Sequence, residues 1–234
     1  MKKIQVRFLL HLFLILLFFA IGCNVYANNI TGSTQIWSTV VLSGSVKHHR
    51  KIKFFIEPQL FLRDDKYKFN IGFLTAAVGY SLIPQATFWL GGTRLDIRET
   101  TGALQREYRL WQQVRWHLVK TAQYELGSRT LLEERQRASQ SQRGTRLRQR
   151  IKLVLPLSSF KKLSLVLSDE IFLNLNQPQW VINRVFAENR AAIGFAFSLD
   201  KRTKIALGYL NQFLYSTPKE MANVLNMAVF YQLN

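Results

Sequence analysis

The sequence is poor in cysteine and in acidic residues, and both shortages narrow the classes of protein to consider. Its 234 residues hold a single cysteine, Cys23, so no disulfide within the chain can form. Aspartate and glutamate together number 14 against 32 lysines and arginines, which gives a formal net charge of +18. A charge of this sign indicates nucleic acid, a membrane surface or an acidic ligand as partner.

Long apolar runs are absent from the sequence except near its N-terminus. There, residues 8–21 are apolar apart from His11, and a basic segment precedes them, with Lys2, Lys3 and Arg7. The run is short for a bilayer span, and small residues follow it. The pattern therefore predicts a cleaved signal peptide over residues 1–27 and a single mature domain over residues 28–234.

The end of this signal has two interpretations. Val25-Tyr26-Ala27 presents small residues where a signal peptidase reads them, which predicts cleavage before Asn28. Alternatively, the segment that ends at Cys23 is a lipoprotein signal, with Ala20 where leucine is usual. Both interpretations export the protein, and export argues against DNA or RNA as its partner.

The mature chain shows no convincing helical period and divides instead into segments of alternating character. The clearest is Lys51–Arg63, in which apolar residues from Ile52 to Leu62 alternate with polar ones. The other segments are Thr34–Gly44, Asn70–Leu82, Gln85–Arg98, Glu107–Lys120, Ala122–Glu134, Thr145–Leu155, Lys162–Leu173, Arg184–Leu199, Lys204–Tyr215 and Ala222–Leu233. Alternation places polar and apolar side chains on opposite faces of a strand.

We predict an all-β fold, an antiparallel transmembrane β-barrel of about 10–12 strands. Short connections alternate with longer polar ones, as they do between the periplasmic turns and external loops of outer-membrane barrels. A soluble β-sandwich is the alternative, and the polar second face and even length of nearly every segment disfavour it. The eleven segments conflict with the even strand numbers of bacterial barrels, so ten and twelve strands both stay open.

The stretch RGTRLRQRIKLVL (143–155) places a cation on every second residue, with apolar residues between; the cations are Arg146, Arg148, Arg150 and Lys152. On the lipid face, an arginine at the membrane midplane costs about 2–4 kcal/mol. We therefore place this row in the lumen, where water or counter-charges can satisfy it. Buried cations need acidic partners, which the neighbouring strands must supply.

A belt of charges follows if each connection folds symmetrically about its centre. Arg148 then lies opposite Glu133 and Glu170, Glu170 lies opposite Arg190, and Arg190 lies opposite Gln212. The same assumption pairs Arg115 with Glu125 and Trp111 with Arg129. The predicted belt is Glu133, Arg148, Glu170, Arg190 and Gln212. The other residues predicted to face the lumen are Glu107, Arg109, Trp111, Gln113, Arg115, His117, Glu125, Arg129, Arg146 and Arg150, of which Arg146 and Arg150 have no acidic partner in this register.

Several short motifs resemble a known family. They are REYRLWQQ (106–113), SRTLLEERQR (128–137), RLRQR (146–150), LSDEIFLN (167–174), ENR (188–190) and LGYLNQF (207–213). In these motifs the chain is similar to the bacterial proteins grouped as domain of unknown function 2490, which are regarded as outer-membrane β-barrels. Glu134 stands where that family usually has glutamine. The resemblance implies a fold and a location, and it implies no activity, ligand or catalytic residue.

Three functions are compatible with these patterns. The first is an outer-membrane barrel that acts as a narrow channel or binding barrel for a small or anionic solute. The second is a structural or adhesive barrel that contacts lipopolysaccharide, and the third is a lipid-modifying hydrolase. No serine is paired by spacing with His117, so we predict no catalytic residue, and we also expect no cofactor and no metal. The expected partners are outer-membrane lipids and a small anion, with the barrel a monomer in the cell outer membrane.

Overall fold

The computed structural model describes residues 30–64, 68–99, 102–160 and 162–234, and these form eleven β-strands. The strands are β1 (Ile30–Val46), β2 (His49–Arg63), β3 (Lys68–Ile83), β4 (Ala86–Arg98), β5 (Leu104–Lys120), β6 (Glu125–Arg137), β7 (Gly144–Pro156), β8 (Leu163–Asn174), β9 (Phe186–Ser198), β10 (Thr203–Leu214) and β11 (Lys219–Gln232). Within these ranges no helix is long and apolar enough to cross a membrane. The predicted signal peptide over residues 1–27 lies outside the described residues.

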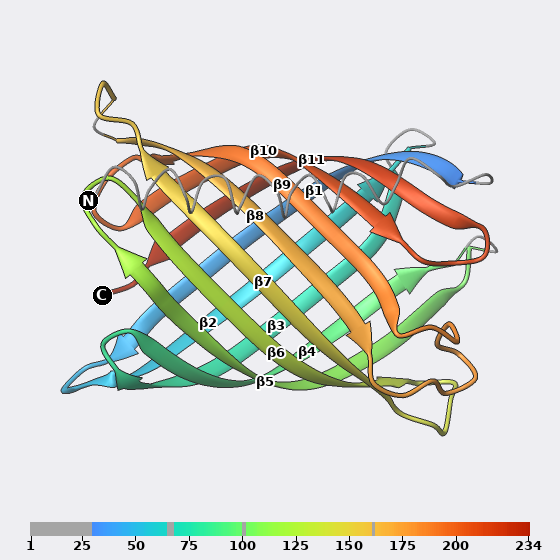
Figure 1. Cartoon of the computed structure of the whole chain (residues 1–234). Helices are drawn as coiled ribbons and strands as arrows, with labels where there is room; N and C mark the ends of the chain where they lie inside the picture. The colour runs from blue at the N-terminus through green and yellow to red at the C-terminus, as the bar shows by residue number, and fades with distance from the viewer. Residues whose placement is uncertain (1–29, 65–67, 100–101, 161) are drawn as a thin grey trace.

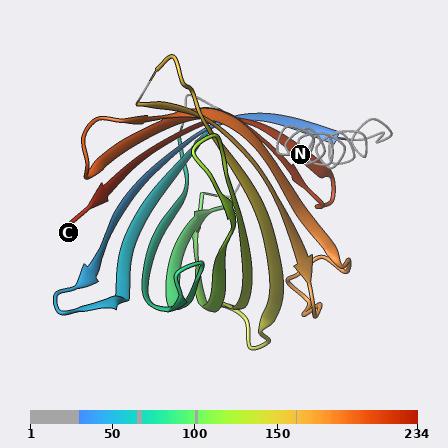
Figure 2. The same cartoon turned by 60° about the vertical axis from the view of Figure 1, so that its left-hand side comes forward.

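The strands close into one barrel, in which consecutive strands are hydrogen-bonded neighbours (Figures 1 and 2). Consecutive strands pair antiparallel, whereas β1 and β11 pair in parallel, for example with Thr34 opposite Asn223. Ten reversals of direction separate the first strand from the last, and because this number is even the two strands must point the same way. Eleven strands lie within the predicted range of about 10–12, although the number is neither of the two even values that were expected. The closing pair is an exception to the antiparallel prediction.

Each segment predicted from alternation overlaps one strand, so the all-β prediction is confirmed. The connections are short at the barrel end where β11 finishes: residues 47–48 join β1 to β2, and residues 84–85 join β3 to β4. Asp200 closes the β9–β10 turn there, because its carboxylate accepts hydrogen bonds from the backbone N–H groups of Arg202 and Thr203 at 2.6 and 2.8 Å. The longest connection, residues 175–185 between β8 and β9, lies at the opposite end.

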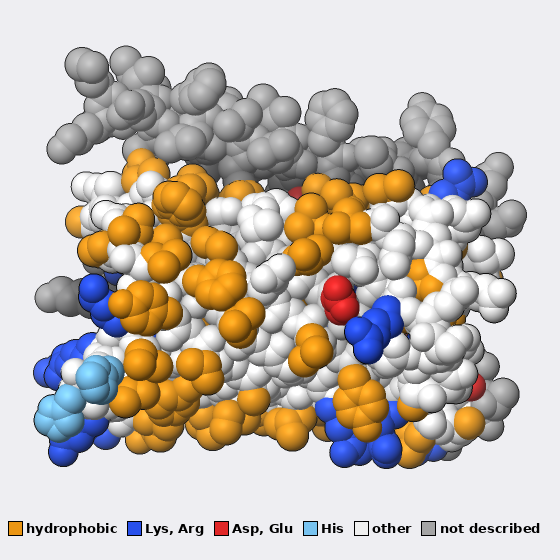
Figure 3. All heavy atoms as spheres, turned by 90° about the horizontal axis from the view of Figure 1, so that it is seen from below, with side chains coloured by type: hydrophobic (Ala, Val, Ile, Leu, Met, Phe, Trp, Pro, Cys, Tyr) orange, Lys and Arg blue, Asp and Glu red, His pale blue; other side chains and the backbone are white. Residues whose placement is uncertain are grey.

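Alternation separates an apolar outer wall from a mixed interior. On β3, Leu74 and Val78 are 55% and 57% exposed on the outside, while the intervening Thr75 and Ala77 are buried inside the barrel. Figure 3 shows such hydrophobic side chains spread over one face of the molecule, with basic groups concentrated towards the two ends. Large apolar side chains left exposed around a closed sheet suit a surface that faces lipid rather than water.

The interior is filled by two groups of aromatic and aliphatic side chains. Trp37 of β1 stacks on Phe61 of β2 with ring centroids 4.0 Å apart, and Leu210 and Val224 pack against them. A second cluster contains Phe55, Ala77, Trp89, Trp111 and Leu131 from β2 to β6. The remaining inner surface, along β5 to β9, carries charged side chains.

Candidate functional site

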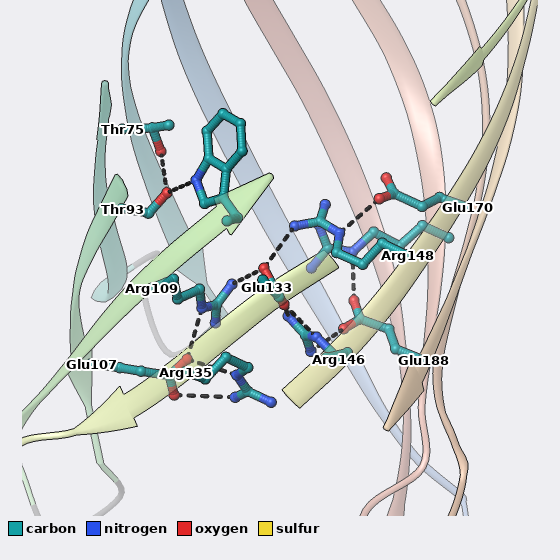
Figure 4. A network of polar contacts seen from close by, with 12 residues as sticks. Thr75, Thr93, Glu107, Arg109, Glu133, Arg135, Arg146, Arg148, Glu170 and Glu188 are labelled. Carbon is teal, nitrogen blue, oxygen red and sulfur yellow. Dashed lines mark hydrogen bonds and ion pairs between the residues drawn. The ribbon is translucent and has the colours of Figure 1, made fainter. Parts of the chain in front are cut away.

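Strands β5 to β9 turn acidic and basic side chains into the lumen. Glu107 on β5, Glu133 on β6, Glu170 on β8 and Glu188 on β9 are all buried. Around them lie Arg109, Arg129, Arg135, Arg146, Arg148 and Arg190. Figure 4 labels four of these arginines, Arg109, Arg135, Arg146 and Arg148. We call these ten residues the ion-pair belt. The strand alternation places them on one face, because inward positions are odd-numbered on β5 and β6 and even-numbered on β7 to β9.

Glu107 forms one end of the ion-pair belt and accepts from two arginines. Arg109 Nε lies 2.7 Å from Glu107 Oε1. Arg135, on the neighbouring strand, donates through Nε to Oε1 at 2.8 Å and through Nη2 to Oε2 at 3.1 Å. This two-point contact is the geometry in which a guanidinium binds a carboxylate most strongly.

Arg148 links the next two acids. Its Nη1 lies 3.5 Å from Glu133 Oε2, and its Nε donates to Glu170 Oε1 at 2.8 Å. Glu133 also accepts from Arg146 Nε at 2.5 Å, and Glu170 accepts from Arg129 Nη2 at 2.5 Å. Each of these acids thus has two arginine partners at 3.5 Å or closer, which offsets the cost of removing a carboxylate from water.

Glu188 completes the ion-pair belt on β9. Its Oε1 accepts from Arg190 Nε at 2.5 Å and from Gln212 Nε2 at 2.6 Å, and its Oε2 lies 3.9 Å from Arg146 Nη1. The last contact joins β7 to β9 past the intervening β8. Such a contact is possible only across the inside of the barrel.

Phe172 of β8 lies at the centre of three guanidinium groups. It is fully buried, and the guanidinium carbons of Arg146, Arg148 and Arg190 lie 4.9, 4.5 and 4.7 Å from its ring centroid. An aromatic face attracts cations, more strongly where water is excluded. Phe172 therefore stabilises arginines that repel one another.

The ion-pair belt and the first aromatic cluster close a ring of contacts around the lumen. Arg190 lies 4.8 Å above the Trp37 ring, Trp37 stacks on Phe61, and Phe61 contacts Phe73 at 4.7 Å between centroids. From Phe73 the ring continues through Arg109, at 6.0 Å, to Glu133, at 3.9 Å. At this level side chains from strands that are not neighbours, such as β9 and β1, meet inside the barrel, so they fill part of the lumen.

The structure corrects several of the predicted pairs. Glu133 lies opposite Arg146, and Glu170 lies opposite Arg150, so both partners assigned to Arg148 were displaced by two residues. Arg148 nevertheless reaches both acids diagonally. Two other predicted pairs are found in the structure: Glu170 lies opposite Arg190, and Arg190 lies opposite Gln212. In the side-chain contacts, however, Arg190 and Gln212 both bind Glu188.

The pairs predicted between β5 and β6 were wrong. Arg115 lies opposite Arg129, not Glu125, and Trp111 lies opposite Glu133, not Arg129. The connection between these strands spans residues 121–124, whereas the predicted segments Glu107–Lys120 and Ala122–Glu134 left only residue 121 between them. The ladder also shifts between His117 and Val119. Arg146 was also expected to lack an acid, yet it binds Glu133.

The other residues predicted to face the lumen occupy two regions. Trp111 and Gln113 are buried in the wall of the aromatic cluster, where Trp111 Nε1 donates to Thr93 Oγ1 at 3.0 Å. His117 lies at a barrel end with its side chain 52% exposed, and its Nδ1 is 2.9 Å from Glu125 Oε1. Over the described ranges no serine hydroxyl hydrogen-bonds to His117, and no group of three or more metal-ligating side chains forms.

The prediction missed Glu188 and Arg135, which are both central to the ion-pair belt. Each lies two residues from a residue that was placed in the lumen, Arg190 and Glu133 respectively. The alternation that placed those residues would have placed Glu188 and Arg135 as well. The prediction did not extend the alternation to these two positions.

A comparison with known families identifies the group to which the barrel belongs. The model of the family "Protein of unknown function (DUF2490)" matches residues 34–223, which include every strand that carries the ion-pair belt. The chain belongs to the DUF2490 family. This confirms the family resemblance seen in the short motifs.

Two other proteins are similar to this DUF2490 barrel. An uncharacterized protein of Methylorubrum extorquens strain AM1 is 26% identical over 179 residues, covering 76% of this chain and 77% of the relative. Among solved structures, the NanC porin superposes with a TM-score of 0.53 at 11% identity, covering 82% of this chain and 91% of the porin. The second likeness is one of fold.

Proposed function

We propose that the protein is an outer-membrane barrel whose narrow, positively charged lumen passes or binds small anions. The observation that carries this proposal is the charge of the inner wall along β5 to β9. The inward cations are Arg109, Arg115, Arg129, Arg135, Arg137, Arg146, Arg148, Arg150, Lys152 and Arg190, against the acids Glu107, Glu125, Glu133, Glu170 and Glu188. The excess of cations favours anions over cations in the lumen.

The outer wall supports the membrane location. Leu90 and Leu110 are 57% and 72% exposed, and neither would remain so in water without cost. The closed ladder also leaves no free strand edge, so every strand can span a bilayer with its backbone groups paired. The closed ladder likewise supports a monomer surrounded by outer-membrane lipids, because it leaves no strand edge through which a second chain could pair. The fold of the NanC porin is consistent with this role.

The location is tested by fractionating cells that express the full chain. We expect the protein in the outer membrane, running faster on a gel before boiling than after it, because a closed barrel resists mild detergent. Recovery as a soluble periplasmic protein would contradict the membrane part of the proposal.

The selectivity is tested in planar bilayers with a KCl gradient across the refolded protein. We expect small or intermittent currents whose reversal potential has the sign of chloride selectivity. A large conductance with potassium selectivity would contradict the proposal, because it requires a wide lumen of the opposite charge.

A further inference from the structure

Beside the ion-pair belt, buried hydrogen-bond donors gather without an acceptor. Trp89 Nε1, Gln113 Nε2, Arg115 Nε and Arg129 Nε are buried and have no hydrogen-bond partner among the described residues. Trp89 lies opposite Gln113 across β4 and β5, and Arg115 lies opposite Arg129 across β5 and β6. We call these four residues the donor patch. Every unpaired atom in it is a donor, so what the donor patch lacks is an acceptor.

Further cations border the donor patch. Arg150 lies directly opposite Arg129 on β7, and Lys152 follows two residues later on the same face. In the part of the chain that the structure describes, Arg115, Arg150 and Lys152 have no carboxylate within 4.0 Å. Arg129 binds Glu170, an acid that it shares with Arg148.

The acids that face these cations do not balance them. From β2, Glu57 attracts Arg115 and Arg150, but its carboxylate also accepts a hydrogen bond from Gln59. Glu125, near the end of β6, is engaged by His117 and Lys120. Positive charge therefore remains in excess around the donor patch, in contrast to the ion-pair belt.

Aromatic rings fix the position of the central cation. The Arg115 guanidinium lies 5.0 Å from the Phe55 ring centroid and 5.1 Å from that of Trp89. These rings exclude water from one side of the guanidinium and strengthen any charge interaction it makes.

The wall next to the donor patch is free of a side chain at one inward position. Gly127 takes an inward position on β6, two residues before Arg129 and opposite Lys152. A Cβ atom at Gly127 would meet only the carbonyl oxygen of Trp116, at 3.5 Å. Gly127 therefore leaves space where any other residue would place a side chain.

We infer that the donor patch binds the oxyanion group of a small solute, a carboxylate or a phosphate. The inference rests on the proposed function, for which it names the site and the chemical class of ligand. An oxyanion accepts several hydrogen bonds at once and neutralises the surrounding guanidiniums, and charge-assisted bonds of this kind are the strong ones. Water can accept hydrogen bonds there, but it cannot neutralise the charge.

The site is tested by calorimetric titration of the detergent-folded full chain with inorganic phosphate and, separately, with acetate, at constant ionic strength. We expect saturable binding of at least one of these anions. Arg115→Gln should weaken it by about tenfold or more, the worth of one buried charge-assisted hydrogen bond. Arg63→Gln is the matched control: it removes one positive charge from an exposed position at a strand end and should leave the affinity unchanged. Absence of saturable binding, or equal loss in both variants, would overturn the inference.

Gln113→Glu gives a second test that does not depend on the folding of Arg115→Gln. The new carboxylate supplies an acceptor within the donor patch, so we expect a higher unfolding midpoint and loss of phosphate and acetate binding together. A lower midpoint with retained binding would overturn the inference.

The anion channel and the oxyanion site of the donor patch can be refuted independently of each other. Saturable anion binding by a barrel that conducts no ions in bilayers would support the site and remove the channel from the proposed function. An anion-selective current without any saturable anion binding would overturn the site and leave the channel.

Discussion

At the scale of single residues, the most consequential feature is the burial of acids among arginines. Glu133 has a side chain only 1% exposed and lies within 4.0 Å of Arg109, Arg146 and Arg148. Three guanidiniums would face one another at close range if its charge were removed. The ion-pair belt therefore depends on its carboxylates for cohesion more than on any single arginine.

We predict that Glu133→Gln lowers the free energy of unfolding by about 3 kcal/mol, the usual cost of removing one partner from a buried ion pair. Denaturant titration of the folded barrel measures this. Glu134→Gln is the control, because Glu134 is the next residue, points outward with its side chain 57% exposed and lies 3.9 Å from the exposed Arg143. Its change should stay within about 0.5 kcal/mol. Equal midpoints for the two variants would mean that the ion-pair belt is fully hydrated.

The sequence predicts on which face of the sheet a side chain lies, whereas it does not predict which residue lies opposite it on the neighbouring strand. Arg148 was assigned to the lumen correctly although its directly opposing neighbours were displaced by two residues. Because strand side chains alternate with a period of two, a displacement of two residues keeps every side chain on its face. Partners depend in addition on where each turn begins, and alternation carries no information about that.

At the scale of strands, stagger explains the displaced partners. Arg137 at the end of β6 pairs with Glu107 of β5, whereas the ladder to β7 stops at Arg135 opposite Gly144. β6 therefore extends past β7, as the shear of a closed barrel requires, and the connection between them is not symmetric about its centre. The strands themselves were predictable because each is long and alternates clearly.

The register of β6 and β7 can be tested by cross-linking through their outward positions. The structure places Leu132 opposite Leu147, whereas the symmetric connection would place it opposite Gln149. In a Cys23→Ser background, Leu132→Cys with Leu147→Cys should oxidise readily, since directly opposed Cβ atoms lie about 4.5–5.5 Å apart. Leu132→Cys with Gln149→Cys is diagonal, at about 7–8 Å, and should oxidise slowly. Mass spectrometry of the oxidised proteins measures both rates, and the reverse order would refute the register.

Two glycines allow β9 and β10 to approach closely. Gly194 lies opposite Gly208, and a Cβ atom on Gly194 would lie 2.6 Å from Leu207 O and 2.7 Å from Gly208 Cα. These are backbone atoms, which cannot move aside without disturbing the ladder. Glycine is therefore required here for space, and no side chain at Gly194 fits without separating the strands.

We predict that Gly194→Ala lowers the free energy of unfolding by about 1–3 kcal/mol, the range for overpacked sites. Gly32→Ala is the control, because a Cβ atom on Gly32, near the start of β1, would meet nothing within 4 Å. Denaturant titration of the two variants separates the effect of space from the general effect of replacing a strand glycine. A smaller loss for Gly194→Ala than for Gly32→Ala would contradict the close approach.

At the scale of the whole molecule, the odd strand number and the filled lumen belong together. The parallel pairing of β1 with β11 closes a barrel of eleven strands, a size at which inward side chains can still meet. The ring of contacts from Trp37 through Phe73 and Arg109 to Arg190 shows that they do meet. The sequence contains the alternation that produces this interior, but not the strand count that sets its width.

Because the ring of contacts fills part of the lumen, the ion current through the barrel should depend on the arginines in that ring. Arg146 binds Glu133, lies 3.9 Å from Glu188 and contacts the Phe172 ring, so it links β7 to three other strands inside the barrel. We predict that Arg146→Ser raises single-channel conductance in planar bilayers and weakens chloride selectivity, because it removes both bulk and positive charge from the lumen at the level of the ion-pair belt. Arg143→Ser is the control: Arg143 lies in the connection before β7 with its side chain 72% exposed, and its loss should leave the conductance unchanged. If the two variants conduct alike, the ion-pair belt does not limit the current, which must then be limited elsewhere along the barrel.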